Sequence, residues 1–285
     1  MIEVARSDPR YPERLRETSF APERLWIRGR VPPARTPSVA IVGTRRMTDL
    51  GRRMARELAM VLARSGVVIV SGLAQGVDST AHAAAIAVDG LTVAVLGEGL
   101  LEFETMGPVR RRRIASAILE RGALLSQFPL DAHGDRWSFP KRNAVVAALG
   151  DAVVVVEAPL GSGALITAAL AERIGRPLFA IPGPLGAATW LGSNRLISDG
   201  RAQLLASADQ LAALLRIDLA RRGSERSALG PLADRAVALL SAGPADADTI
   251  AAGLGAPLTE VATLVAEMLI GGGVVPTGDG RFALR

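Results

Sequence analysis

The sequence predicts an α/β protein with a Rossmann-like, doubly wound and mostly parallel sheet, followed by a small C-terminal winged-helix-like domain. Two patterns predict the larger fold. Short apolar runs alternate with segments of helical period, and the runs are continuously apolar rather than alternating with polar residues. Strands that are covered by helices on both faces have this composition, because neither face meets water. Repeated strand–helix units of this kind build parallel sheets.

Each element follows from this alternation. Strands are expected at 38–43, 67–71, 92–97, 152–157 and 177–182. Helices are expected between them at 49–64, 77–88, 109–121, 140–149 and 164–174. The predicted domains are a lead-in segment 1–37, a Rossmann-like domain 38–215, a linker 216–230 and a winged-helix-like domain 231–285. The last prediction rests on three short helical patterns (232–240, 248–254 and 258–269) and two apolar runs that flank a Gly-rich turn at 277–280.

Composition excludes several classes of site. The 285 residues are 49% hydrophobic and 21% charged, which is enough for one large domain and a small one. The absence of cysteine excludes disulfides, thiolate zinc sites and cysteine nucleophiles. His82 and His133 lie on different segments, so no metal site is expected. No apolar stretch resembles a signal peptide or approaches the ~20 residues of a membrane span, so we expect a cytoplasmic protein with no membrane partner.

Positive charge is concentrated in the first half of the chain. The net charge is +5, but residues 1–150 carry 22 basic residues against 15 acidic ones, whereas residues 151–285 carry 11 against 13. A polyanionic partner is therefore expected to bind the first half.

Three strand-to-helix corners are rich in small residues. In a doubly wound sheet such corners present helix N-termini, whose free N–H groups and dipoles favour anions. We expect them to line a phosphate-binding crest. Its candidate residues are Gly43, Thr44, Arg45, Arg46, Ser71, Gly72, Gly76, Ser162, Gly163 and Thr167.

The segment 137–143 gathers two aromatic residues, two cations and an amide, and holds the only lysine of the chain. Aromatic faces beside cations suit unpaired bases on a charged backbone. The candidates are Phe139, Lys141, Arg142 and Asn143, with Trp137 as a further stacking residue. Phe139 could equally be a core residue. Four consecutive arginines, Arg110, Arg111, Arg112 and Arg113, open a predicted helix and form either a DNA rail or a solvated basic face.

Motifs for nucleotide cofactors and hydrolysis are missing. No G-x-G-x-x-G opens the first strand–helix turn, and neither G-x-x-x-x-G-K-[ST] nor G-x-S-x-G occurs. His82 follows Asp78 by one helical turn, which favours a structural tie over a catalytic dyad. We expect no catalytic residue, no cofactor and no enzyme.

These corners and the segment 137–143 resemble the DNA-processing protein A (DprA/Smf) family. The similar motifs are Ala40–Arg45, Ser71–His82, Ala94–Gly97, Phe139–Asn143, Val156–Ala158, Ser162–Ala168, Ala180–Gly183 and Gly192–Ile197. The resemblance adds Asn194 to the candidate phosphate-binding residues. It implies a protein that binds and protects single-stranded DNA, forms a homodimer and loads a RecA-type recombinase during natural transformation.

The resemblance is to a divergent member. The Tyr-Pro and Asn that usually follow the third strand are replaced by Leu101–Pro108 and the arginine run, and the helical domain often found ahead of the lead-in segment is expected to be absent. The helix 258–269 carries two glutamates and no cation, so the C-terminal domain is expected to serve protein contacts or packing rather than DNA binding.

Two other functions remain open. A nucleoside monophosphate phosphoribohydrolase places a carboxylate in a P-G-G-x-G-T-x-x-E loop, and Pro159–Gly163 is similar to its beginning, but here the threonine is displaced to Thr167 and the first glutamate is Glu172. A nucleotide-binding sensor with a Rossmann-like fold is the other alternative.

Overall fold

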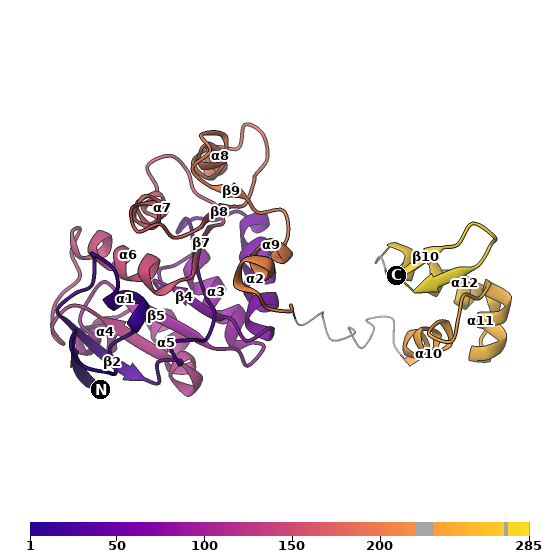
Figure 1. Cartoon of the computed structure of the whole chain (residues 1–285), viewed down its shortest axis with the longest axis horizontal. Helices are drawn as coiled ribbons and strands as arrows, with labels where there is room; N and C mark the ends of the chain where they lie inside the picture. The colour runs from indigo at the N-terminus through magenta and orange to yellow at the C-terminus, as the bar shows by residue number, and fades with distance from the viewer. Residues whose placement is uncertain (220–230, 271–272, 285) are drawn as a thin grey trace. The chain divides into compact units, whose positions relative to one another are not determined.

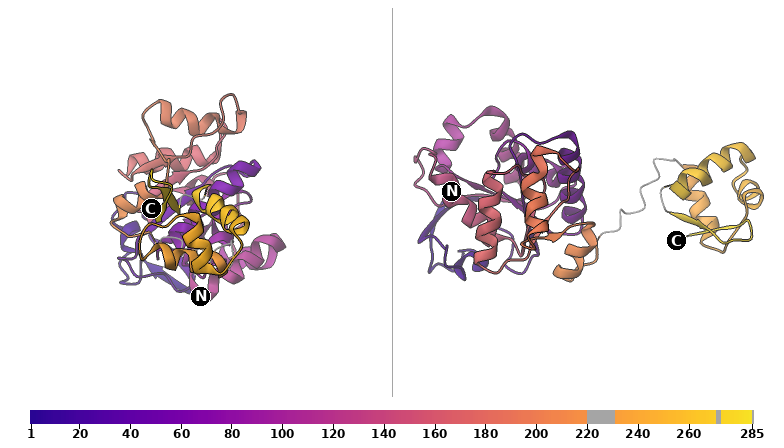
Figure 2. Two further views of the ribbon diagram at one scale, coloured as in Figure 1. Left: turned by 90° about the vertical axis from the view of Figure 1, so that its right-hand side faces the viewer. Right: turned by 90° about the horizontal axis from the view of Figure 1, so that it is seen from above.

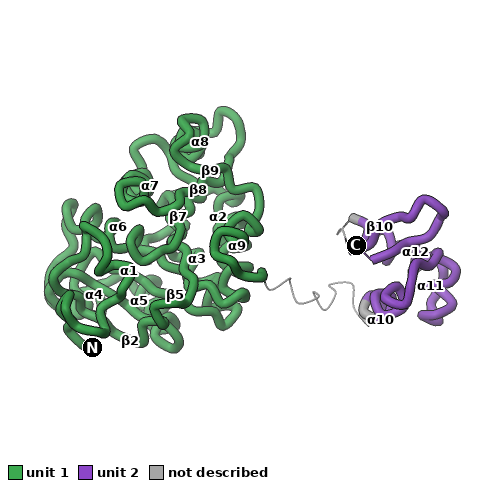
Figure 3. The backbone as a smooth tube through the Cα atoms, viewed as in Figure 1, with its two compact units in different colours: residues 1–220 green, residues 221–285 purple. Residues whose placement is uncertain are grey.

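The chain forms two compact units, which we describe from a computed structural model of residues 1–219, 231–270 and 273–284 (Figure 1). The units are Met1–Ala220 and Arg221–Arg285 (Figure 3). Most of the expected linker, residues 220–230, lies outside the described residues. Among the described residues no single helix is long and apolar enough to cross a membrane. Only the two helices Ala247–Leu254 and Leu258–Leu269, which are bent by 114° relative to each other, reach that apolar length together.

The first unit is built on a nine-stranded sheet within the described residues. Its strands are β1 (Ile2–Ala5), β2 (Arg24–Gly29), β3 (Ser38–Val42), β4 (Val68–Ser71), β5 (Thr92–Leu96), β6 (Ala123–Ser126), β7 (Ala152–Val155), β8 (Leu178–Ala180) and β9 (Gln203–Leu204). The order across the sheet is β1-β2-β6-β5-β4-β3-β7-β8-β9. β2 runs antiparallel to β1 and to β6, and all other pairs are parallel. The predicted Rossmann-like, mostly parallel sheet is confirmed.

Helices cover both faces of this sheet (Figure 2). They are α1 (Glu13–Arg16), α2 (Asp49–Arg64), α3 (Val77–Ile86), α4 (Leu100–Met106), α5 (Val109–Arg121), α6 (Ser138–Leu149), α7 (Gly163–Arg173), the 3-10 helix η1 (Ala188–Trp190), α8 (Leu191–Ser198) and α9 (Ala208–Leu215). α2 and α5 begin and end at the predicted residues. Thr48 defines the start of α2, because its side chain accepts a hydrogen bond from the Gly51 N–H.

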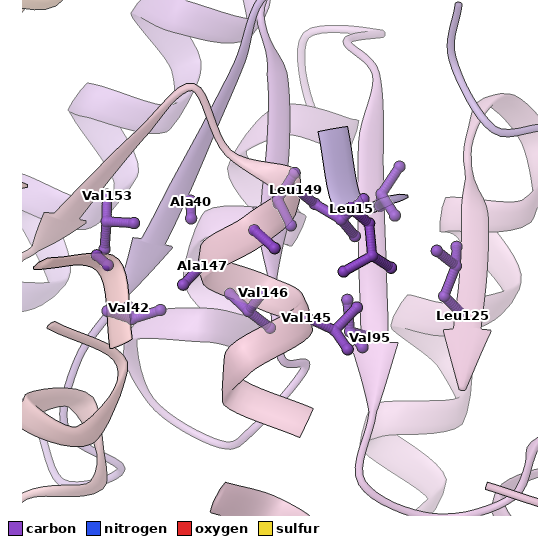
Figure 4. Packing of buried hydrophobic residues seen from close by; sticks show 14 of the residues in the cluster. Leu15, Ala40, Val42, Val95, Leu125, Val145, Val146, Ala147, Leu149 and Val153 are labelled. Atoms are coloured by element: carbon purple, nitrogen blue, oxygen red, sulfur yellow. The ribbon is translucent and has the colours of Figure 1, made fainter. Parts of the chain in front are cut away.

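The two faces are separated by the alternation of side chains along each strand. Val39 and Ile41 of β3 pack with α2, α3 and α9, whereas Ala40 and Val42 pack with α6 and α7 on the opposite face. Figure 4 shows α6 lying on that second face, with Val145 and its neighbours against strand residues of β3 and β5. Strands buried on both sides explain why the runs are continuously apolar.

The chain winds outward from β3 in both directions. From β3 it passes to β4, β5 and β6 on one side, then returns to β7 beside β3 and continues to β8 and β9 on the other. The register pairs Val42 of β3 with Val155 of β7, so these strands end level with each other. The loops that follow them belong to opposite halves of the sheet. Such a switch point leaves a crevice at the carboxyl ends of the strands, where ligands bind in folds of this kind.

Two parts of the sheet carry weaker signals in the sequence. The lead-in segment supplies β1, β2 and α1, and buries Leu15 and Leu25 in the main core. β6 follows directly on α5 through Gly122 and is only four residues long, so it was not among the predicted strands. β6 continues the parallel strands beyond β5, and β2 and β1 add antiparallel strands at that edge of the sheet.

The second unit has a core of its own. Its elements are α10 (Pro231–Leu240), α11 (Ala247–Leu254), α12 (Leu258–Ile270) and an antiparallel pair of β10 (Val274–Pro276) with β11 (Phe282–Leu284). Ile250, Leu254, Val261 and Leu264 are buried in this core. The side chains of Glu260 and Glu267 on α12 are exposed.

Candidate nucleic-acid interface

A groove of about 820 Å³ opens at the switch point between β3 and β7. We call it the switch-point groove. Its walls come from the corners after β3, β4 and β7 and from the first turns of α6 and α7. Among its lining residues are Gly43, Thr44, Arg45, Arg46, Gly72, Asp78, Arg136, Phe139, Arg142, Asn143, Ser162, Gly163 and Thr167. Four segments that are distant in sequence therefore meet in one cavity, namely the three glycine-rich corners and the start of α6.

The corner after β3 is held by Glu157, at the end of β7. The Thr44 N–H donates to the Glu157 carbonyl oxygen at 2.7 Å. Glu157 Oε2 accepts hydrogen bonds from the N–H and the hydroxyl of Thr48, both at 2.9 Å. The side chain of Glu157 is fully buried. These bonds fix the loop that carries Arg45 from both ends, and they join the two halves of the sheet.

Close packing around Glu157 explains a glycine in α2. A Cβ at Gly51 would lie 1.9 Å from Glu157 Oε2, so the carboxylate can approach only because residue 51 has no side chain. Glu157 belongs to one of the family motifs, but no role was predicted for it from the sequence. Its signal was an acidic residue directly after a fully apolar strand, a place where a buried carboxylate must find hydrogen-bond donors.

Arg45 lies over the ring of Phe139, with its guanidinium carbon 5.5 Å from the ring centroid. Phe139 is partly exposed and lines the groove. Its ring also packs on the backbone of Gly97, where a Cβ would lie 2.5 Å from Phe139 Cδ1. Phe139 therefore combines the two roles that the sequence left open, because its ring is partly packed and partly accessible. Arg45 forms no ion pair with any described carboxylate, so its charge is available to a ligand.

Arg142 is placed differently from Arg45. It is 4% exposed, and its Nη1 donates to the carbonyl oxygens of Gly72 and of Val95, the latter at 2.6 Å. Its Nε donates to Asn143 Oδ1 at 3.1 Å. These bonds tie together the carboxyl ends of β4 and β5 beneath the groove. Burial lowers the pKa of Arg142, and the negative charge of Asp78 opposes that shift. Arg142 thus supports the groove floor as well as facing it.

Asp78 and His82 are both buried but have separate partners. Asp78 Oδ2 accepts from the N–H groups of Gly72, at 3.1 Å, and Ala74, at 3.4 Å. His82 Nδ1 lies 2.7 Å from the hydroxyl of Thr92, which donates to the Ile69 carbonyl. The expected tie between the two side chains is wrong, because each is used to fix a different loop or strand. Burial raises the pKa of Asp78 and lowers that of His82 to about 3.

The corner after β7 opens α7. Ser162 caps this helix by accepting the Ala164 N–H at 3.3 Å, and Asn143 Nδ2 donates to the Gly163 carbonyl at 3.3 Å. Space around Gly163 is open, since a Cβ there would meet no atom within 4 Å. Thr167 is buried one turn later and lines the groove. The free N–H groups of α7 therefore face the same cavity as Arg45.

Asp78 is the only carboxylate among the described lining residues of this groove, and it is already engaged by backbone N–H groups. Glu172 instead lies on the exposed side of α7, where it pairs with Arg201 at 3.0 Å. The described residues contain no group of three His, Asp or Glu side chains that could hold a metal ion. The groove offers cations, N–H donors and an aromatic face, which are the groups that contact phosphates and bases.

Residues 3–216 match the family described as DNA recombination-mediator protein A. The chain belongs to this family. Its sequence is 37% identical to Protein Smf of Escherichia coli over 286 residues, which cover 96% of this chain and 75% of that protein. The matched residues 3–216 include every described lining residue of the switch-point groove.

Two solved structures of family members are similar to the chain. DNA processing protein A from Streptococcus pneumoniae matches with a TM-score of 0.68 and 34% identity, covering 74% of this chain and 73% of that one. DNA processing protein A from Helicobacter pylori matches with a TM-score of 0.65 and 32% identity, covering 72% and 92%. The second structure is described as giving insight into the single-stranded DNA binding mode of that protein.

Several predicted site residues of this family member lie outside the switch-point groove. Lys141 is exposed on α6 but does not line the cavity. Ser71 is fully buried and donates to the Ile41 carbonyl at 2.6 Å, and Asn194 pairs with both backbone groups of Gly183. The structure places these two in supporting contacts.

The predicted arginine rail is divided. Arg110 and Arg111 line a neighbouring groove together with Gly76, whereas Arg112 and Arg113 line neither. Arg112 instead donates to the Glu104 carbonyl at 3.1 Å. The four consecutive arginines therefore do not act as one surface, because successive residues of a helix point in different directions.

Proposed function

We propose that this family member binds single-stranded DNA in the switch-point groove, without catalysis and without sequence preference. The observation that carries the proposal is the stacked pair of Arg45 and Phe139 at the crevice of the sheet. An unpaired cation beside an accessible ring can hold a phosphate and a base of the same strand. The similarity to the Helicobacter pylori protein supports this assignment.

We further propose that the chain protects incoming DNA and loads a RecA-type recombinase in natural transformation, as a cytoplasmic homodimer. Family membership supports this role. Four large apolar side chains between residues 185 and 214 are exposed, and a partner subunit would cover them. They are Leu185, Leu191, Leu204 and Leu214. Size-exclusion chromatography with light scattering should give twice the mass of one chain, and a monomer would contradict the dimer.

Fluorescence anisotropy with labelled oligo-dT and with a duplex of equal length tests the DNA assignment. The single strand should bind more tightly, and its affinity should fall steeply as salt rises, because phosphate contacts release counterions. Equal affinity for the duplex would contradict the single-strand preference. Failure to bind the oligonucleotide even at low salt would overturn the assignment as a whole. Recombinase loading is tested separately, by the rate at which RecA-type filaments form on DNA coated with single-strand binding protein.

A further inference from the structure

A second groove, of about 620 Å³, lies between α2, α3 and the start of α5. We call it the arginine groove. Its described lining residues include no carboxylate and no aromatic residue. Six of them are arginines, namely Arg45, Arg46, Arg52, Arg56, Arg110 and Arg111. Like charges gathered in a concave surface create a strong positive potential, which attracts anions into it.

Most of this charge is not neutralised within the described residues. Arg56 and Arg110 form no ion pair there, and Arg52 lies 3.8 Å from the exposed Asp49, a contact that solvent screens. Arg111 differs, because it lies 3.0 Å from Glu98 and donates to the Leu73 carbonyl at 2.9 Å. Arg111 is therefore held by the protein, while the other side chains remain available to a ligand.

The position of Arg110 adds to this excess of charge. Arg110 lies in the first turn of α5, which has no acidic residue and no side-chain cap. The positive end of the helix dipole lies at the same place, so a cation there is unfavourable unless an anion is bound nearby. The same charge on the last turn of a helix would be favourable. The sequence therefore places positive charge where a bound anion would be favourable.

The arginine groove meets the switch-point groove at Arg45 and Arg46, which line both. The start of α3 closes against this junction. Gly76 has a φ of +93°, and a Cβ on it would lie 2.3 Å from the Thr44 carbonyl oxygen. This close approach brings the first turn of α3 against the loop that carries Arg45, so two cations lie at the junction of the two grooves.

We propose that the arginine groove is a second tract of the polynucleotide path. A single strand held in the switch-point groove continues across Arg45 and Arg46 and lays its phosphates along Arg52, Arg56 and Arg110. The inference rests on the proposed function of the first groove. The two tracts differ in chemistry, because the first has the Phe139 ring for a base and the second offers only charge and small side chains. The second tract therefore binds backbone and adds affinity only for longer strands.

The test compares two double variants on oligo-dT of two lengths. One variant is Arg56→Ala with Arg110→Ala. Its control is Arg53→Ala with Arg113→Ala, which removes one exposed arginine from each of the same two helices but from neither groove. The oligonucleotides have about 6 and about 16 residues, within the range of roughly 4–16 nucleotides for single-strand sites. Anisotropy titrations at several salt concentrations give the affinity and its salt dependence.

We expect the groove variant to bind the long oligonucleotide roughly tenfold more weakly, with a salt slope smaller by about 1.4, since each lost phosphate contact removes about 0.7. Its affinity for the short one should match that of the wild type. The control variant should match the wild type on both. Equal melting temperatures of all three proteins show that folding is unchanged.

Unchanged affinity for the long strand, an equal loss in the control, or an equal loss on the short strand would each overturn the second tract. The first groove would then still bind the short oligonucleotide. Failure of the wild type to bind either length would instead overturn the proposed function itself, and the second tract with it.

Discussion

The guanidinium of Arg142 occupies the space beside Gly72 that any larger residue would need. A Cβ on residue 72 would lie 2.1 Å from Arg142 Nη1. The glycine of the second corner therefore admits a buried cation to the carbonyls at the ends of two strands. The need for glycine here comes from a neighbouring side chain, because the backbone of Gly72 is not in the left-handed region.

Gly72→Ala should lower the free energy of unfolding by about 1–3 kcal/mol, because the added methyl group must displace a tightly held guanidinium. Urea denaturation measures this change. Gly163→Ala is the matched control, since a Cβ at Gly163 meets nothing within 4 Å. Equal stabilities of the two variants would show that Arg142 moves aside without loss.

Substitution of Arg45 should affect DNA binding, whereas substitution of Arg142 should affect stability. Arg142→Met leaves the carbonyl groups of Gly72 and Val95 without their donor and should destabilise the protein by about 1–3 kcal/mol for each unsatisfied group. Arg45→Ala should leave the unfolding midpoint unchanged while it weakens single-stranded DNA binding and reduces the salt slope by about 0.7. Denaturation curves beside anisotropy titrations test both. A stable Arg142→Met protein, or an Arg45→Ala protein with full affinity, would contradict this division of roles.

Trp137 should report on a bound strand. Its side chain is 63% exposed at the start of α6, and Arg136, which lines the switch-point groove, lies 4.9 Å from its ring centroid. Stacking of a base should quench its fluorescence, whereas Trp190 is buried. Trp137→Ala should abolish the quenching and weaken binding by about 1–3 kcal/mol. Trp26→Phe is the control, and quenching that persists in Trp137→Ala would exclude stacking on Trp137.

Burial of His82 should make the free energy of unfolding depend on pH. Its pKa is lowered from 6.5 to about 3 in the fold, so the unfolded chain binds a proton between these values that the folded chain does not. The free energy of unfolding therefore falls as pH drops through this window, by at most about 1.4 kcal/mol per pH unit for one proton. Asp78 acts in the opposite direction, because burial raises its pKa.

Comparison with His82→Gln isolates the histidine, since Asp78 is present in both proteins. Between about pH 7 and about pH 5 the wild type should lose more stability than the variant in urea denaturation. Parallel pH profiles would mean that His82 is protonated in the folded protein after all.

The C-terminal unit should not contribute to DNA affinity. The exposed face of α12 carries Glu260 and Glu267, which repel phosphates. A chain that ends at Leu219 should therefore bind oligo-dT as tightly as the full chain, on both lengths and at every salt concentration. A clear loss of affinity would show that the second unit contacts the strand.

The parallel half of the fold could be predicted because its signals are local. β3 is a fully buried apolar run, and α2 is an amphipathic helix capped by Thr48. Both lie where the sequence predicts them. The short strand β6 and the antiparallel β2 depend on pairing with distant partners, Trp26 with Ser126 for example. A four-residue run such as Ala123–Ser126 carries no pattern that separates a strand from the end of a helix.

The position of the site could be predicted from its glycine-rich corners, but the roles of its side chains could be predicted less well. Glycine-rich turns identified where the groove lies, because parallel strands end on one edge. Burial decides what each cation does, and the sequence does not show burial. Lys141 and Arg142 are adjacent cations in the sequence. In the structure Lys141 is exposed, whereas Arg142 is buried beneath the groove and only 4% exposed. The role of Glu157 could not be predicted from the sequence either, because its hydrogen-bond partner Thr48 is remote in sequence.

The bond between Glu157 and Thr48 has a consequence for the order of events during synthesis. A ribosome releases the first half of the sheet before residue 157, and domains begin to fold from their N-terminal side. Until β7 arrives, the loop with Arg45 lacks the carboxylate that fixes it. The corner that carries Arg45 is therefore fixed only after β7 and Glu157 have been synthesised.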